Sequence, residues 1–188
     1  MTQSRGRGAR ERIVAAAAAL FEAQGITATT MEQIAASAPV SKRTLYAHFP
    51  AKDDLVVTFL RYVDELGLTA ERTLYDDEVP VRDRILGLFT VPVRGDGPFR
   101  GCPFTAAAIE FPDPDSPAHA YTRDRKSAFT IRIAELLAEL GAGDPTGLAE
   151  QLAILADGVS SRAMVFNDTG RADLGRAAAE ALLRAEGI

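Results

Sequence analysis

Five side chains within one short segment carry hydrogen-bond donors of several chemical types. Lys42 and Arg43 supply cationic donors, Thr44 and Tyr46 supply hydroxyl groups, and His48 supplies a ring N–H. Such groups bind the phosphate oxygens of nucleic acids, and arginine, lysine and threonine also contact base edges in the major groove. The simpler interpretation is a solvated polar helix face, so the elements that position these donors decide between the two.

The helix before these donors carries signals at both ends. Thr30 can cap its first turn, and Gln33 stands three residues later, which is the spacing of a capping box. Pro39 marks the other end, because the residue before a proline avoids helical backbone angles. These signals predict a short helix that ends at the turn Ala38–Val40.

A second short helix follows that turn and carries the donors. Ser41 is a suitable N-cap for a helix over Lys42–His48, and Pro50 breaks the chain after it. Two short helices joined in this way form a helix-turn-helix, whose second helix enters the major groove of DNA. The start of the first helix, at Thr30, directs N–H groups outward and suits an anion, and Lys52 adds a cation beyond the second helix.

The predicted DNA contacts come from these two helices and the start of the next: Thr30, Ser41, Lys42, Arg43, Thr44, Tyr46, His48 and Lys52. We expect the first three residues of the second helix to meet base edges, because that end of a recognition helix contacts bases. We expect Tyr46, His48 and Lys52 to bind phosphates. A packing or capping role is the alternative for His48.

These positions resemble the DNA-binding domain of TetR-type transcriptional regulators. The resemblance rests on an apolar helix from Ile13 to Phe21 followed by a specific series of residues: Thr30, Ile34, Ala35, Ala38, Val40, Ser41, Thr44, Leu45, Tyr46, His48, Phe49, Lys52 and Leu55. The chain departs from the family at Pro39, where glycine is usual, and at Arg43, where glycine is frequent. Because Arg43 is expected to contact bases, the operator sequence of other members does not transfer.

The resemblance implies an all-α fold, with a three-helix helix-turn-helix DNA-binding domain followed by a helical ligand-binding and dimerisation domain. Apolar periodicity predicts helices over 7–24, 31–38, 42–48, 52–75, 81–91, 104–110, 117–140, 146–166 and 173–186. No segment alternates with the period of a strand, so we expect no sheet. We place the domains at 1–52 and 53–188, with residues 1–8 a tail that is disordered without DNA.

Charge is distributed unevenly between these two domains. The whole chain has a net charge of -5, which argues against a polybasic nucleic-acid binder. Residues 1–52, however, contain seven basic and three acidic side chains, and the remainder contains 14 basic and 23 acidic ones. This asymmetry favours a basic module that meets a polyanion, although a basic N-terminal tail is a common alternative.

A small-molecule effector is a further implication of the resemblance, bound between the fourth helix and those that follow. Aromatic and aliphatic candidates for its pocket are Phe59, Tyr62, Phe89, Phe104, Ile109, Phe111 and Phe129. Plain core packing is the alternative for each, because pockets and cores use the same residue types. This pool predicts an apolar or aromatic effector, and the proline-rich segment 92–117 is expected to form its entrance or lid.

The resemblance also implies a homodimer that pairs through its last two long helices in a four-helix bundle. Candidates for the seam are Leu148, Leu152, Leu155, Val159, Leu182 and Leu183, with burial inside one chain as the alternative. Two-fold symmetry would place the two recognition helices one DNA turn apart, about 34–36 Å, or on a longer palindrome.

Residues for other chemistries are scarce. A single cysteine, Cys102, excludes an intramolecular disulfide, and two histidines exclude most metal sites. We find no catalytic triad and no phosphate loop, so we predict no catalytic residues, no metal and no cofactor. An inert thiol is favoured over a redox sensor at Cys102, whose one basic neighbour in sequence is Arg100. With neither a signal peptide nor a membrane span, a cytoplasmic protein without a membrane partner is expected.

The sequence therefore predicts a ligand-responsive transcriptional regulator. We expect a repressor that binds a palindromic double-stranded DNA operator and is released by a small apolar or aromatic molecule. The alternative is a helix-turn-helix interaction protein that acts on DNA through protein partners. An enzyme is the third class, and no catalytic pair supports it.

Overall fold

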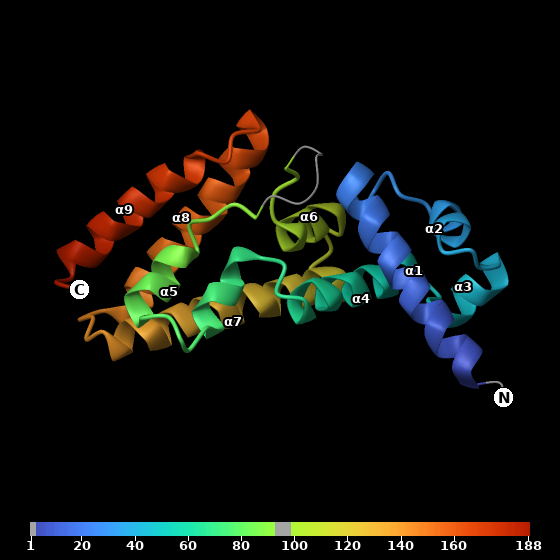
Figure 1. Ribbon diagram of the computed structural model, residues 1–188, viewed down its shortest axis with the longest axis horizontal. Helices are drawn as coiled ribbons and strands as arrows, with labels where there is room; N and C mark the ends of the chain where they lie inside the picture. The colour runs from blue at the N-terminus through green and yellow to red at the C-terminus, as the bar shows by residue number, and fades with distance from the viewer. Residues whose placement is uncertain (1–2, 93–98) are drawn as a thin grey trace. The chain divides into compact units, whose positions relative to one another are not determined.

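The computed structural model describes residues 3–92 and 99–188, which form helices and contain no strand (Figure 1). The helices are α1 (Gln3–Gln24), α2 (Met31–Ser37), α3 (Lys42–His48), α4 (Lys52–Glu65), the 3-10 helix η1 (Ala70–Tyr75), α5 (Val81–Gly87), α6 (Pro103–Glu110), α7 (Pro117–Glu139), α8 (Pro145–Phe166) and α9 (Arg171–Ala185). The predicted all-α class is confirmed.

The chain divides into two compact units. Unit 1 comprises Met1–Leu66 and Pro103–Thr122, and unit 2 comprises Gly67–Cys102 and Arg123–Ile188. These units divide the chain differently from the predicted domains 1–52 and 53–188. The reason is that α4 packs against α1 and α6 packs against α4, and local sequence patterns do not specify such long-range contacts.

Unit 1 is organised around α1, which packs against α2, α3 and α4. Figure 1 shows α2 and α3 on the same side of α1. Their contacts are apolar: Ile13, Ile34 and Leu45 are fully buried, and the rings of Phe21 and Phe59 meet edge to face at 5.2 Å. This core holds α3, the expected recognition helix, in a fixed position relative to α1, because close-packed side chains are not easily displaced.

The first helix begins earlier than its periodicity predicts. Its backbone is helical from Gln3 instead of residue 7, and the side chains of residues 1–7 lie outside those described. The predicted disorder of residues 1–8 without DNA stays a prediction. Arg10 belongs to the packed module, since its guanidinium lies 5.3 Å from the Phe49 ring centroid and donates a 3.4 Å hydrogen bond to Thr58 Oγ1.

Two predicted helices are too long. The expected helix over 52–75 ends at Glu65, and the chain turns at Gly67, whose φ is 58°. This positive φ favours glycine, and a Cβ there would also lie 2.6 Å from Arg72 Cδ. The expected helix over 81–91 likewise ends at Gly87, where a Cβ would lie 2.3 Å from Thr73 Oγ1.

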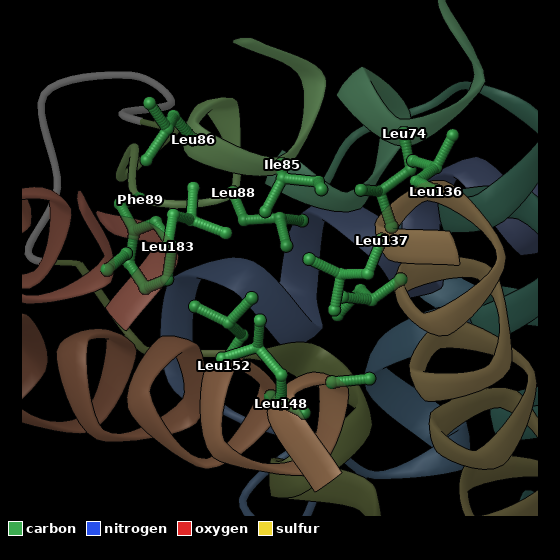
Figure 2. Close-up of a cluster of buried hydrophobic side chains, with 14 of the residues drawn as sticks. Leu74, Ile85, Leu86, Leu88, Phe89, Leu136, Leu137, Leu148, Leu152 and Leu183 are labelled. Atoms are coloured by element: carbon green, nitrogen blue, oxygen red, sulfur yellow. The ribbon is translucent and has the colours of Figure 1, made fainter. Parts of the chain in front are cut away.

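Unit 2 has its own hydrophobic core. Figure 2 shows leucine, isoleucine and phenylalanine side chains from η1, α5, the residues directly after α5, α7, α8 and α9 pointing toward one another. Within this unit α8 and α9 form a hairpin whose helices approach closely at Gly175, where a Cβ would lie 2.2 Å from Val159 Cγ2. The inner faces of α8 and α9 are therefore occupied inside one chain.

Candidate nucleic-acid interface

The start of α2 is held by the predicted capping box, which the structure confirms. Thr30 Oγ1 accepts a 3.2 Å hydrogen bond from the Gln33 backbone N–H, and Gln33 Oε1 accepts one of 2.8 Å from the Thr30 N–H. Gln24 at the end of α1 donates to Gln33 Oε1 at 3.1 Å, which ties the two helices together. The reciprocal bonds satisfy two N–H groups that a helix start otherwise leaves without partners.

The recognition helix α3 is oriented by one cap and two buried side chains. Ser41 Oγ accepts a 3.0 Å hydrogen bond from the Thr44 backbone N–H, as an N-cap should. Leu45 and Phe49 are buried in unit 1. The opposite face of the helix must then point outward, because residues three and four apart share a face.

The structure places the predicted DNA contacts in three environments. Lys42, Arg43 and Tyr46 are exposed on the outer face of α3, with 45% of Tyr46 accessible. Thr44 is half-buried, with its hydroxyl 2.8 Å from Ser41 Oγ. His48 is half-buried in the last turn of α3. Thr30 and Ser41 are exposed, and their hydroxyls serve as caps.

The turn between α2 and α3 has proline at a position that favours glycine. The Val40 N–H donates to the Ala35 carbonyl at 3.0 Å, which is the hydrogen bond of a Schellman motif that joins residues five apart in sequence. The same motif ends α7. There Gly141 also donates the second hydrogen bond of the motif, which joins residues three apart, to the Ala138 carbonyl at 3.0 Å. Pro39 has a φ of 27°, far from the proline norm of about -65°, and has no N–H to donate. This turn is therefore strained and lacks one bond.

Lys52 is engaged inside unit 1. Its ammonium donates a 3.4 Å hydrogen bond to the Thr27 carbonyl in the loop between α1 and α2. The Thr27 hydroxyl in turn donates to the Glu110 carboxylate at the end of α6. Burial lowers the pKa of Lys52, and the nearby Glu110 charge partly offsets that lowering. These contacts favour an internal positioning role for Lys52 over the predicted phosphate contact.

Glu110 and Glu32 are residues that sequence reasoning missed. Glu110 contacts the loop that leads into α2 from a distant part of the chain, and no local pattern marks such a contact. Glu32 lies on α2, and its Oε1 is 3.0 Å from Lys42 Nζ on α3. The spacing of two short helices across a turn could have suggested Glu32, but the pairing depends on how the helices cross.

The predicted effector residues are distributed over both units. In unit 1, Phe59 and Phe104 are buried, Tyr62 and Phe111 are half-buried, and Ile109 is 73% exposed. In unit 2, Phe89 and Phe129 belong to the hydrophobic core. The high exposure of Ile109 is unlike that of a pocket-lining side chain. The predicted lid at 92–117 falls partly outside the described residues, and the part that is described includes α6.

The predicted seam residues divide between core and surface. Leu148, Leu152, Val159 and Leu183 are buried within unit 2, as the alternative interpretation had it, so they have no free face for a second chain. Figure 2 shows three of them pointing into the core. Leu155 and Leu182 instead line an open apolar groove on α8 and α9 with four further residues: Gln151, Ile154, Ala178 and Ala181.

Other site types can be examined only in the described part of the chain. Within residues 3–92 and 99–188, no helix combines the length and hydropathy that crossing a membrane requires. In the same ranges there is no group of three or more His, Cys, Asp or Glu side chains that could bind a metal ion. Cys102 is a half-buried free thiol.

Comparison with known proteins points to one family. The profile of bacterial regulatory proteins of the tetR family matches residues 13–58. A TetR transcriptional regulator of Streptomyces avermitilis, sav143, is 32% identical, covers 96% of this chain and 98% of its own, and superposes with a TM-score of 0.83. The TetR-family regulator SCO4454 of Streptomyces coelicolor is 28% identical over 97% of each chain, with a TM-score of 0.80. The HTH-type transcriptional regulator YjdC of Escherichia coli is 28% identical over 93% of each chain.

Proposed function

The chain belongs to the TetR family of bacterial transcriptional regulators, and on that basis we propose that it is a repressor that binds a palindromic operator as a homodimer and is released by a small molecule. Membership makes it a DNA-binding transcriptional regulator and not an enzyme. The observation that carries the operator proposal is the outer face of α3. Its capped first turn exposes Lys42 and Arg43 while Leu45 and Phe49 anchor the opposite face.

Replacing Arg43 with alanine is expected to weaken operator binding by about 5- to 150-fold, the range for losing a bidentate contact to a guanine. Arg43→Lys keeps the charge but loses the planar fork, so it should lose most of the same discrimination. Fluorescence anisotropy measures the affinity of each variant for an operator selected from a random-sequence library and for a random duplex. An equal loss on the two duplexes would assign Arg43 to a phosphate instead of a base.

The proposed dimer uses the apolar groove between α8 and α9. Ile154 is 70% exposed in one chain, and the neighbouring residues Ala178 and Ala181 are small enough to let a second helix approach. On α8, Gly158 has no atom within 4 Å of where its Cβ would lie, which leaves further room on that helix. Apolar groups exposed together favour burial against a second copy. The two-fold axis would then relate two α3 helices.

Effector release is proposed to act through α6. This helix belongs to unit 1, packs against α4, and ends at Glu110, which binds Thr27 and attracts Lys52. These contacts hold the loop that leads into α2. A ligand with higher affinity for a displaced α6 would break them and favour a state in which α3 no longer matches the groove. The predicted apolar or aromatic ligand and its pocket residues stay part of this proposal.

Replacing Glu110 with glutamine is expected to weaken operator binding about 5- to 20-fold in the absence of any ligand, within the usual range of allosteric coupling. The expected direction opposes simple electrostatics, because removing a negative charge should strengthen binding to a polyanion. Glu65→Gln, an exposed site on α4, controls for that charge effect. Anisotropy titrations at fixed salt measure both variants, and tighter binding by Glu110→Gln would contradict the coupling.

A further inference from the structure

We propose that Glu32 is an affinity-setting residue that acts as an internal counterion for Lys42 and competes with DNA phosphates for it. This inference rests on the proposed contact between α3 and DNA. Glu32 would then limit how tightly the protein binds DNA of any sequence, and it would lower the salt dependence of that binding.

The geometry places the two charges in direct contact across the helix-turn-helix. Glu32 Oε1 and Lys42 Nζ are 3.0 Å apart, and their side chains are 53% and 65% exposed. Each residue stands in the first turn of its own short helix, α2 or α3. The hydrogen bond from Lys42, together with a smaller contribution from the backbone N–H of Glu32, holds the pKa of Glu32 below its usual range.

The Glu32 carboxylate interacts with its own backbone N–H, but the capping box of α2 does not depend on it. The capping box of α2 is complete with Thr30 and Gln33, and neither bond uses the Glu32 side chain. Its negative charge does favour the start of α2 through the helix dipole. That benefit is available to any acidic residue in the turn, whereas contact with Lys42 places this carboxylate beside a cation of the proposed DNA surface.

Counterion balance gives the proposal a quantitative signature. A lysine that binds a phosphate displaces a condensed cation from the DNA, which contributes about 0.9 to the slope of log affinity against log salt. When Lys42 leaves Glu32 to bind a phosphate, the freed carboxylate stays near the DNA, where its negative charge retains part of the cation density that the lysine would displace. Lys42 therefore adds less than its full contribution to the salt slope while Glu32 is present.

The test uses a random-sequence duplex and sodium chloride titrations, so it needs no operator. Glu32→Gln is expected to raise affinity about 2- to 10-fold at low salt, in line with the loss of one exposed ion pair and one charge repulsion. The salt slope should steepen, by at most about 0.9. In a Lys42→Gln background the same substitution should give less than half of that gain in log affinity. Glu11→Gln, at an exposed site on α1, is the matched control for charge alone.

The outcomes separate this inference from the proposed function. Equal gains from Glu32→Gln with and without Lys42, or an equal gain from Glu11→Gln, would show a general charge effect and overturn the inference. No gain from Glu32→Gln while Lys42→Gln weakens binding would also overturn it, with the DNA contact of α3 intact. If Lys42→Gln changes nothing in the Glu32→Gln background, Lys42 does not contact DNA and its place in the proposed function fails as well.

Discussion

Replacing Ile154 with glutamate is expected to give a folded monomer whose affinity for a palindromic operator is lower by about 10²- to 10⁴-fold, the usual gain from linking two binding modules. Ile154 is 70% exposed in the single chain, so the substitution should cost little folding free energy. Across a dimer seam it would place two carboxylates in the apolar groove beside Leu155 and Leu182, where unpaired charges cannot be buried cheaply.

Light scattering after size-exclusion chromatography measures the mass of this variant, and anisotropy compares its binding to a full palindrome and to a half-site. The half-site affinity should be nearly unchanged, because α3 lies in unit 1. Ile131→Glu is the matched control, since Ile131 on α7 is 60% exposed and does not line the groove. A dimeric Ile154→Glu variant would place the interface elsewhere.

Pro39→Gly is expected to raise the free energy of unfolding of unit 1 by about 1–3 kcal/mol, the cost of a residue held in a sparsely populated backbone region. Glycine adopts positive φ without strain and restores an N–H that can donate to the Ala36 carbonyl, as Gly141 does at the end of α7. Glycine also raises the conformational entropy of the unfolded chain, which offsets part of this gain in the free energy of unfolding. We still expect a net gain in the free energy of unfolding, because the pyrrolidine ring of proline opposes a φ of 27° and glycine does not.

Thermal unfolding followed by circular dichroism measures this effect, with an expected rise of about 2–4 °C in Tm per kcal/mol for a chain of this size. Gly141→Ala is the reciprocal control, because its φ of 86° disfavours any side chain, and its Tm should fall. A lower Tm for Pro39→Gly would mean that the rigidity of proline contributes more to this turn than its strain costs.

The sequence predicted the helix-turn-helix well because its signals are local. The capping box at Thr30, the N-cap at Ser41 and the bounds of Lys42–His48 are all confirmed. Each depends on residues within one turn of each other, so backbone hydrogen bonding fixes them independently of the rest of the fold. The helical spacing of the apolar residues Leu45 and Phe49 is also local. It predicts that both face inward and that the opposite face of α3 is exposed, and the structure buries both residues.

Features that depend on tertiary contacts could not be predicted in the same way. Leucines on α8 repeat with a helical period whether they face their own chain or a second one. The sequence therefore predicts a seam for Leu148 and Leu152, whereas the structure places them in the core. The break at Gly67 has a positive φ and lies close to Arg72, a contact that the sequence does not show. The contacts of Glu110 depend on α6 joining unit 1.

The most direct test of the central claim, that a dimer recognises bases through the exposed face of α3, is selection of operators from a random-sequence library. We expect enrichment of a palindrome whose half-sites are centred about 34–36 Å apart, or of a longer palindrome of related spacing. We also expect Arg43→Ala to relax the preference at one position in each half-site. Enrichment of no palindrome, or the same preference in the wild type and in Arg43→Ala, would contradict the account.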